Sequence, residues 1–178
     1  LLSSHSQVFG MGEDSVFNGM LPEIRDKIVH AFAKAPVGRQ VDSKVTRAIN
    51  KVTEEYSQKV VQGMHDKVPL DQIEAVDFIV DKMLFNFRNV GFIHLLFPKA
   101  KIIHTVRNFW DVLYSCYKYK FEDQGLEWSF SLDHIVNFFV MYRRLMRHWE
   151  QVLPGRVYTV QYEELVGNPK EVVEKLLD

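Results

Sequence analysis

Hydrophobic and polar positions in residues 75–121 predict a strand, a helix, a second strand and a second helix. Residues 77–82 hold three consecutive apolar side chains and end on a charged pair, and residues 101–106 are rich in β-branched side chains. Between these runs, residues 85–97 carry apolar side chains at helical spacing until a proline ends the pattern. Two strands joined by one helix predict a parallel βαβ unit with a right-handed crossover.

Similar patterns extend over the rest of the chain. Further strands are expected at residues 8–11 and 157–162, and Pro22 suits the first turn of a helix at residues 21–35. Additional helices are expected at residues 43–64, at residues 133–149 and from residue 169 onward. This alternation of strands and helices predicts an α/β fold with a parallel sheet.

Composition narrows the class of protein. The chain has 178 residues, 47% of them hydrophobic, which fits one globular domain with a real core. A net charge of -1 gives no basic field for nucleic acid. No run reaches the roughly 18 apolar residues of a membrane span. Seven histidines and the single Cys116 show no metal-ligand spacing, so we predict no metal site and a reducing, cytoplasmic location.

Charged residues follow the predicted strands where parallel sheets bind ligands. Arg107 can form two hydrogen bonds with a phosphate, and Ser115 can donate to the same group near a helix N-terminus. An ion pair between Arg107 and Asp111, with a serine buried against its own turn, explains the spacing equally well. Tyr162 closes the last predicted strand, where it could contact a nucleotide or belong to the core.

Two further residues could carry chemistry. Lys82 could stabilise charge on a transferring group or on its leaving oxygen, and the alternative is an ion pair with Asp81 or Asp77. Glu13 follows two closely spaced glycines and could act as a general base toward a hydroxyl group. The alternative for Glu13 is a helix-start carboxylate beside Asp14.

These segments together resemble the sulfotransferases that use 3′-phosphoadenosine 5′-phosphosulfate (PAPS). The matching stretches are DKMLFNFRNVGFIHLLFPKAKIIHTVR, DVLYSCY, VQYEELVGNP and SSHSQVFGMGE. They are most similar to the bacterial branch that is often joined to TPR repeats and is related to the tyrosylprotein sulfotransferases. The resemblance implies a three-layer fold like that of the P-loop nucleotide kinases, with a central parallel sheet and a helical insert at residues 21–70.

The resemblance also implies a reaction. A sulfuryl group would pass from PAPS to a hydroxyl acceptor, which could be a sugar, a peptide or a small molecule, without a metal. Glu13 resembles the general base for the acceptor, with Asp14 as a competing alignment. Lys82 resembles the lysine that stabilises the leaving phosphate and the moving sulfuryl group.

Recognition of the nucleotide is implied in the second half of the chain. Arg107 and Ser115 resemble the pair that binds the 3′-phosphate of PAPS, and Tyr162 resembles a tyrosine near the same nucleotide. The family's 5′-phosphosulfate loop would lie before Leu1, and its nucleotide-closing loop after Asp178. We therefore expect one sulfotransferase-like domain, residues 1–178, cut at both ends from a longer protein.

Two other functions stay open. The chain could be a catalytically inactive nucleotide-binding or interaction remnant of the same fold. It could also be a nucleotide-kinase-like phosphoryl transferase, whose G-x-x-x-x-G-K-[ST] motif is not in these residues. The arginine and serine pair favours PAPS over ATP. The acceptor is not named by any motif, although residues 121–131 and the helical insert are expected to shape its site.

Overall fold

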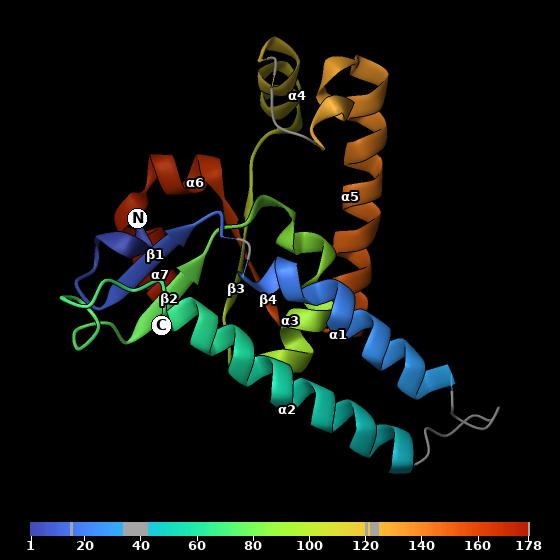
Figure 1. Ribbon diagram of the computed structural model, residues 1–178. Helices are drawn as coiled ribbons and strands as arrows, with labels where there is room; N and C mark the ends of the chain where they lie inside the picture. Colours follow the sequence, from blue (N-terminus) through green and yellow to red (C-terminus); the bar gives the residue numbers. More distant parts are fainter. Residues whose placement is uncertain (15, 34–42, 120, 122–124, 178) are drawn as a thin grey trace. The chain divides into compact units, whose positions relative to one another are not determined.

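The computed structural model describes residues 1–14, 16–33, 43–119, 121 and 125–177. The chain divides into two compact units, Leu1–Lys99 and Ala100–Asp178, each of which contains one two-stranded parallel sheet with helices (Figure 1). The prediction of α/β structure with parallel strands is confirmed within each unit. The two strands predicted to form one βαβ unit, at residues 78–81 and 102–106, instead belong to separate two-stranded sheets, each paired with another strand. The single domain, the three layers and the central sheet stay predictions, because they concern how the two units combine.

A parallel pair of strands, β1 (Val8–Gly12) and β2 (Phe78–Asp81), forms the sheet of the first unit. The pairing ends with Gly12 opposite Asp81, after a register irregularity between Gly10 and Gly12. Both strands were predicted within one residue of these bounds at their carboxyl ends. The irregularity matters because it sets which side chains leave the sheet next to each other.

Helices of the first unit differ from prediction in two places. In chain order they are η1 (Leu2–Ser4), α1 (Val16–Ala33), α2 (Ser43–His65), η2 (Leu84–Arg88) and α3 (Val90–Leu96). Because α1 begins five residues before the predicted start, Pro22 lies inside the helix and not in its first turn. The helix predicted at residues 85–97 is divided at Asn89 into a 3-10 helix and a short α-helix.

The core of the first unit lies where α1 packs on α2. It is built from buried side chains of α1, α2 and α3, namely Ile24, Ile28, Tyr56 and Leu96. A fully buried aliphatic or aromatic side chain stabilises a fold by about 1.5–3 kcal/mol. Burial of this cluster therefore stabilises the packing of α1 and α2, the helices that connect β1 to β2.

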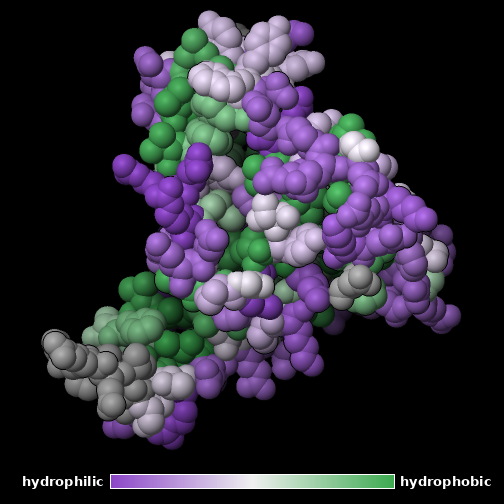
Figure 2. Space-filling model, turned by 180° about the vertical axis from the view of Figure 1, so that it is seen from behind, coloured by the Kyte–Doolittle hydropathy of each residue, from purple (hydrophilic) through white to green (hydrophobic). Residues whose placement is uncertain are grey.

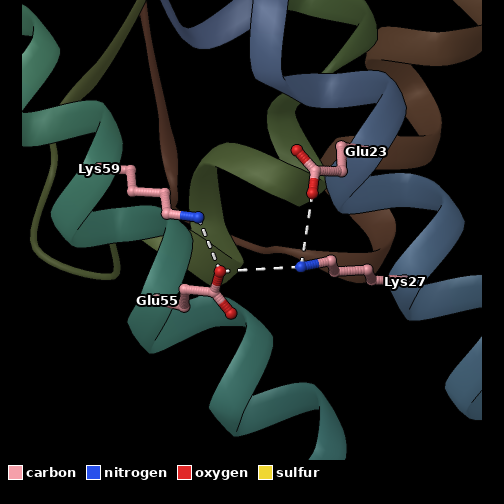
Figure 3. Close-up of polar contacts among 4 residues, drawn as sticks. All are labelled: Glu23, Lys27, Glu55 and Lys59. Carbon is pink, nitrogen blue, oxygen red and sulfur yellow. Dashed lines mark hydrogen bonds and ion pairs between the residues drawn. The ribbon is translucent and has the colours of Figure 1, made fainter.

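An ion-pair network spans the surface of the same two helices (Figure 3). Lys59 Nζ donates to Glu55 Oε1 at 2.7 Å, and side chains four residues apart in a helix are close enough to pair in this way. Lys27 lies between Glu55 and Glu23, at 3.7 Å and 3.4 Å. The hydrogen bond from Lys59 lowers the pKa of the Glu55 carboxyl. Both lysines also lie over the ring of Tyr56.

The second unit is built on another parallel pair, β3 (Ile102–Val106) and β4 (Val157–Gln161), which run in uninterrupted register. Its helices are α4 (Phe109–Lys118), η3 (Glu127–Phe130), α5 (Leu132–Val152), α6 (Tyr162–Gly167) and α7 (Pro169–Leu177). The predicted strands and the long helix are confirmed, but Tyr162 starts α6 and does not end β4. Residues 122–124 of the predicted acceptor loop lie outside the described residues.

Aromatic side chains provide much of the packing in the second unit. Trp128 stacks on Phe138 with ring centres 4.0 Å apart, and the ring centres of Phe109 and Phe139 are 4.1 Å apart. Ile135 of α5 is buried. Other hydrophobic side chains are exposed, and the aliphatic ones on the face seen in Figure 2 appear green. Within the described ranges, we find no helix with the length and apolar character needed to span a bilayer.

Candidate active site

Glu13 and Lys82 form an ion pair at the carboxyl ends of β1 and β2. The pairing ends with Gly12 opposite Asp81. Glu13 and Lys82 are therefore the first residues after the paired strands. The Lys82 N–H donates to the Gly12 carbonyl at 2.8 Å, and Lys82 Nζ donates to Glu13 Oε1 at 2.5 Å. The Lys82 and Glu13 side chains are 68% and 52% exposed. Exposed pairs contribute only about 0–1 kcal/mol, so a ligand can separate these charges at little cost.

Lys82 pairs with Glu13 and not with Asp81 or Asp77, the partners considered from the sequence alone. Asp81 accepts hydrogen bonds from groups that follow it along the chain. Its partial burial raises the pKa of the carboxyl group. Asp77 instead accepts from the Gln7 side-chain amide at 2.5 Å. Both aspartates therefore accept hydrogen bonds from groups other than the Lys82 ammonium.

Asp14, the competitor of Glu13, serves the start of α1. Its Oδ1 accepts from the Val16 N–H at 2.7 Å, and its Oδ2 lies 3.4 Å from Lys67 Nζ. Its side chain is 17% exposed. The helix-start role that was the alternative for Glu13 is thus filled by its neighbour.

The second unit places Arg107 beside Tyr162 by the same strand geometry. Val106 and Gln161 are register partners at the ends of β3 and β4, so Arg107 and Tyr162 are the first residues after the two strands. The guanidinium carbon lies 4.8 Å from the centre of the tyrosine ring. Arg107 Nη2 also lies 3.5 Å from Asp111 Oδ2, so the ion pair considered from the sequence is present as well.

Two residues that sequence reasoning missed hold the start of α4. Asn108 caps this helix, since its Oδ1 accepts from the Trp110 N–H at 2.9 Å. The Asn108 N–H donates to Glu163 Oε1 at 2.8 Å, and this hydrogen bond lowers the pKa of Glu163. An asparagine just before a helix was a usable capping signal. The partnership with Glu163 had no local signal, because the two residues are 55 positions apart and follow different strands.

The predicted site residues fall into two groups. Glu13 and Lys82 are together in the first unit, while Arg107 and Tyr162 are together in the second. Ser115 also belongs to the second unit, where it is half-buried on α4. Among the residues that the structure describes, no cluster of three or more His, Cys, Asp or Glu could hold a metal ion.

Comparison with known proteins identifies the family. The family model described as "Sulfotransferase family" matches residues 1–178. A protein of Aquifex aeolicus (strain VF5), named "Uncharacterized protein", is 33% identical over 187 residues, which cover 100% of this chain and 23% of that protein. The chain thus spans about a quarter of the length of this relative. Its match to the family model over its whole length shows that the chain belongs to the sulfotransferase family.

Proposed function

We propose that the protein transfers a sulfuryl group from PAPS to a hydroxyl acceptor. Family membership supports the reaction class. The observation that carries the proposal is the Glu13–Lys82 contact of 2.5 Å, which holds a proton acceptor and a cation side by side. They lie at the carboxyl ends of parallel strands, the edge at which α/β sheets bind their ligands.

The chemistry follows from these two side chains. Glu13 takes the proton of the acceptor hydroxyl while the oxygen forms its bond to sulfur. The bond from sulfur to the 5′-phosphate oxygen breaks, and 3′-phosphoadenosine 5′-phosphate (PAP) leaves with the electron pair. Lys82 neutralises the charge that develops on the leaving oxygen. By analogy with phosphoryl transfer, the transition state is loose, so positioning and charge stabilisation carry the catalysis.

Arg107, Ser115 and Tyr162 are proposed to bind the nucleotide. The Arg107 side chain is 45% exposed, so it can accept an incoming ligand. Its guanidinium can make two parallel hydrogen bonds to the 3′-phosphate, and Ser115 can add a third from α4. The competing contact with Asp111 is exposed and 3.5 Å long, which makes it weak. Remote phosphate binding of this kind positions the reacting sulfuryl group.

We also propose Glu13 as the base in preference to Asp14. Asp14 is committed to the Val16 N–H and to Lys67, and little of its side chain is exposed. Glu13 is half exposed and contacts the proposed catalytic lysine. The motif segments further support assignment to the bacterial branch often joined to TPR repeats, and the single Cys116 supports a cytoplasmic enzyme. Sugar, peptide and small-molecule hydroxyls are the acceptor classes to test.

Calorimetry with PAP and ADP tests the nucleotide assignment. We expect PAP to bind more tightly than ADP, because only PAP carries a 3′-phosphate for Arg107. Hydrogen bonds to charged groups contribute about 1.5–3 kcal/mol, so Arg107→Ala should weaken PAP binding by about 10-fold to 100-fold. Arg144→Ala, which removes an exposed arginine of α5, is the matched control. Equal binding of PAP and ADP would favour the phosphoryl transferase instead.

Turnover measurements separate the two groups of residues. Lys82→Ala should lower the rate of sulfuryl transfer while the affinity for PAP stays close to that of the wild type. Arg107→Ala should show the reverse pattern, with its main effect on nucleotide binding. Binding of PAP without any transfer to sugar, peptide or small-alcohol acceptors would favour the inactive nucleotide-binding remnant.

A further inference from the structure

Three asparagine side chains in the first unit form a hydrogen-bonded chain that ends on Asp81. Asn89 Nδ2 donates to Asn18 Oδ1 at 3.1 Å, and Asn18 Nδ2 donates to Asn86 Oδ1 at 3.1 Å. Asn86 Nδ2 then donates to Asp81 Oδ2 at 3.0 Å. The side chains come from α1, from η2 and its carboxyl end, and from the end of β2, and all are partly buried. Residues nearly seventy positions apart are thereby connected.

The direction of this chain is determined by its last member. An ionised carboxylate only accepts hydrogen bonds, so Asn86 must present its NH₂ group to Asp81 and its oxygen to Asn18. For the same reason, Asn18 directs its NH₂ group to the oxygen of Asn86, and Asn89 directs its NH₂ group to the oxygen of Asn18. Hydrogen bonds in such a series polarise one another, so each is strengthened by the next.

Asp81 uses its other oxygen to shape the backbone around Lys82. Asp81 Oδ1 accepts from the Met83 N–H at 2.9 Å, which closes a turn with Lys82 in the middle. The Lys82 N–H meanwhile donates to the Gly12 carbonyl. The backbone of Lys82 is thus held on one side by β1 and on the other by a carboxylate that Asn86 fixes in place.

We propose that Asp81, Asn86 and Asn18 are positioning residues that keep Lys82 in contact with Glu13. None of them is assigned to touch the substrate. Their catalytic importance rests on the proposed function, whereas their effect on the Lys82–Glu13 contact can be measured without any reaction. Removing one member leaves a partly buried group without its partner and lets the turn around Lys82 move.

Exchanging the two ends of one hydrogen bond provides the sharpest test. Asn86→Asp places two carboxylates against each other, whereas Asp81→Asn allows all the amide groups to reverse and keep their hydrogen bonds. The double variant Asp81→Asn/Asn86→Asp restores every bond in principle. The amide introduced at position 81 would accept from the Met83 N–H and donate to position 86, and the carboxylate at position 86 would still accept from Asn18.

Carbodiimide cross-linking detects the Glu13–Lys82 contact directly. The reagent joins a carboxylate to a touching ammonium group as an amide with net loss of water, and peptide mass spectrometry quantifies the Glu13–Lys82 product. The Glu55–Lys59 pair, 2.7 Å apart across one turn of α2, gives an internal control in the same unit. Asn86→Asp should reduce the Glu13–Lys82 product by about fivefold or more, without changing the control. The double variant should recover it to within about twofold.

The possible outcomes all decide the question. An unchanged Glu13–Lys82 product in Asn86→Asp would overturn the positioning role, as would a double variant as low as Asn86→Asp alone. If Asn86→Asp does not fold, both products are lost, and the double variant alone decides. The rate of sulfuryl transfer should follow the cross-link, with PAP affinity unchanged. Cross-links that behave as expected in a protein without turnover would contradict the proposed function and leave the positioning role supported.

Discussion

The guanidinium of Arg107 lies over the ring of Tyr162, 4.8 Å from its centre, because the preceding residues are paired in parallel strands. A guanidinium has five N–H donors, so Arg107 can contact the ring and still donate to a phosphate. The two residues are far apart in sequence, so this arrangement depends on the register of β3 and β4. It gives the proposed nucleotide site a cation whose position is set by the sheet.

Replacing Tyr162 tests whether the ring supports Arg107. A cation–π contact at an exposed site contributes about 0.5–1 kcal/mol, so Tyr162→Ala should weaken PAP binding by about twofold to fivefold. Tyr162→Phe keeps the ring and should bind PAP like the wild type. Isothermal titration calorimetry measures both. Equal losses in the two variants would mean that the hydroxyl group, and not the ring, contacts the nucleotide.

Glu13 and Asp14 should give opposite results when each is replaced. Glu13→Gln removes the proposed base and should lower kcat by about 10²-fold to 10⁴-fold. Its stability should change little, because the ion pair with Lys82 is exposed. Asp14→Ala removes the cap of α1 and should cost about 0.5–2 kcal/mol of unfolding free energy.

Sulfuryl-transfer assays and urea unfolding distinguish these two variants. Activity of Asp14→Ala should remain near that of the wild type at temperatures where the variant is folded. A large loss of kcat in Asp14→Ala together with full activity of Glu13→Gln would reverse the assignment of the base.

Local patterns in the sequence predicted most elements of the fold. The apolar runs of β2 and β3 and the long amphipathic faces of α2 and α5 are strong signals, and their bounds were confirmed closely. The start of α1 was missed because its cap, Asp14, was interpreted as a rival base. The break at Asn89 was missed because a polar residue on an apolar helix is usually solvated, whereas Asn89 bonds to α1.

Contacts between distant residues were the part that sequence reasoning could not supply. The Glu13–Lys82 pair depends on a register irregularity between Gly10 and Gly12, and nothing local specifies it. Lys82 was therefore assigned two local aspartates as alternative partners. The site residues themselves were chosen from strand ends, which the parallel pairing places at one edge in each unit.

Glu163 should make the second unit sensitive to acid. Its folded-state pKa is lowered by the hydrogen bond from the Asn108 N–H, so the ionised form stabilises the fold. This stabilisation is present above the usual glutamate pKa of about 4.3 and is lost as pH falls through the lower folded value. Glu163→Gln should lower the unfolding temperature at pH 7, and the difference from wild type should disappear in strong acid. Glu150→Gln on α5 controls for loss of a charge, and an equal effect there would contradict a specific role.

His104 should add a second pH dependence of the same sign at higher pH. It bonds to the Tyr142 hydroxyl, and burial lowers its pKa. Below the usual histidine pKa of about 6.5 the unfolded chain binds a proton that the folded chain resists, so stability falls as pH falls. His104→Gln keeps an acceptor for Tyr142 and should flatten this slope. Urea unfolding between neutral pH and the lower folded pKa measures it, and parallel slopes would contradict the expectation.

Gly12 connects the backbone of β1 to the position of Glu13. Its φ of +69° is in the left-handed region, where a residue with a Cβ atom is destabilised by about 1–2 kcal/mol. A Cβ at this position would meet no atom within 4 Å, so the cost of Gly12→Ala is a backbone cost. The carbonyl of Gly12 also accepts the Lys82 N–H. We therefore expect Gly12→Ala to lower both the unfolding free energy and the yield of the Glu13–Lys82 cross-link.

Gly19 is the matched control for this glycine. It lies inside α1, and a Cβ there would likewise meet no atom within 4 Å. Because alanine favours helices over glycine by about 0.8–1.0 kcal/mol, Gly19→Ala should stabilise the protein and leave the cross-link unchanged. Opposite signs in urea unfolding would separate the backbone requirement at Gly12 from a general effect of adding a methyl group. A Gly12→Ala protein as stable as wild type would show that the turn before Glu13 does not need the left-handed conformation.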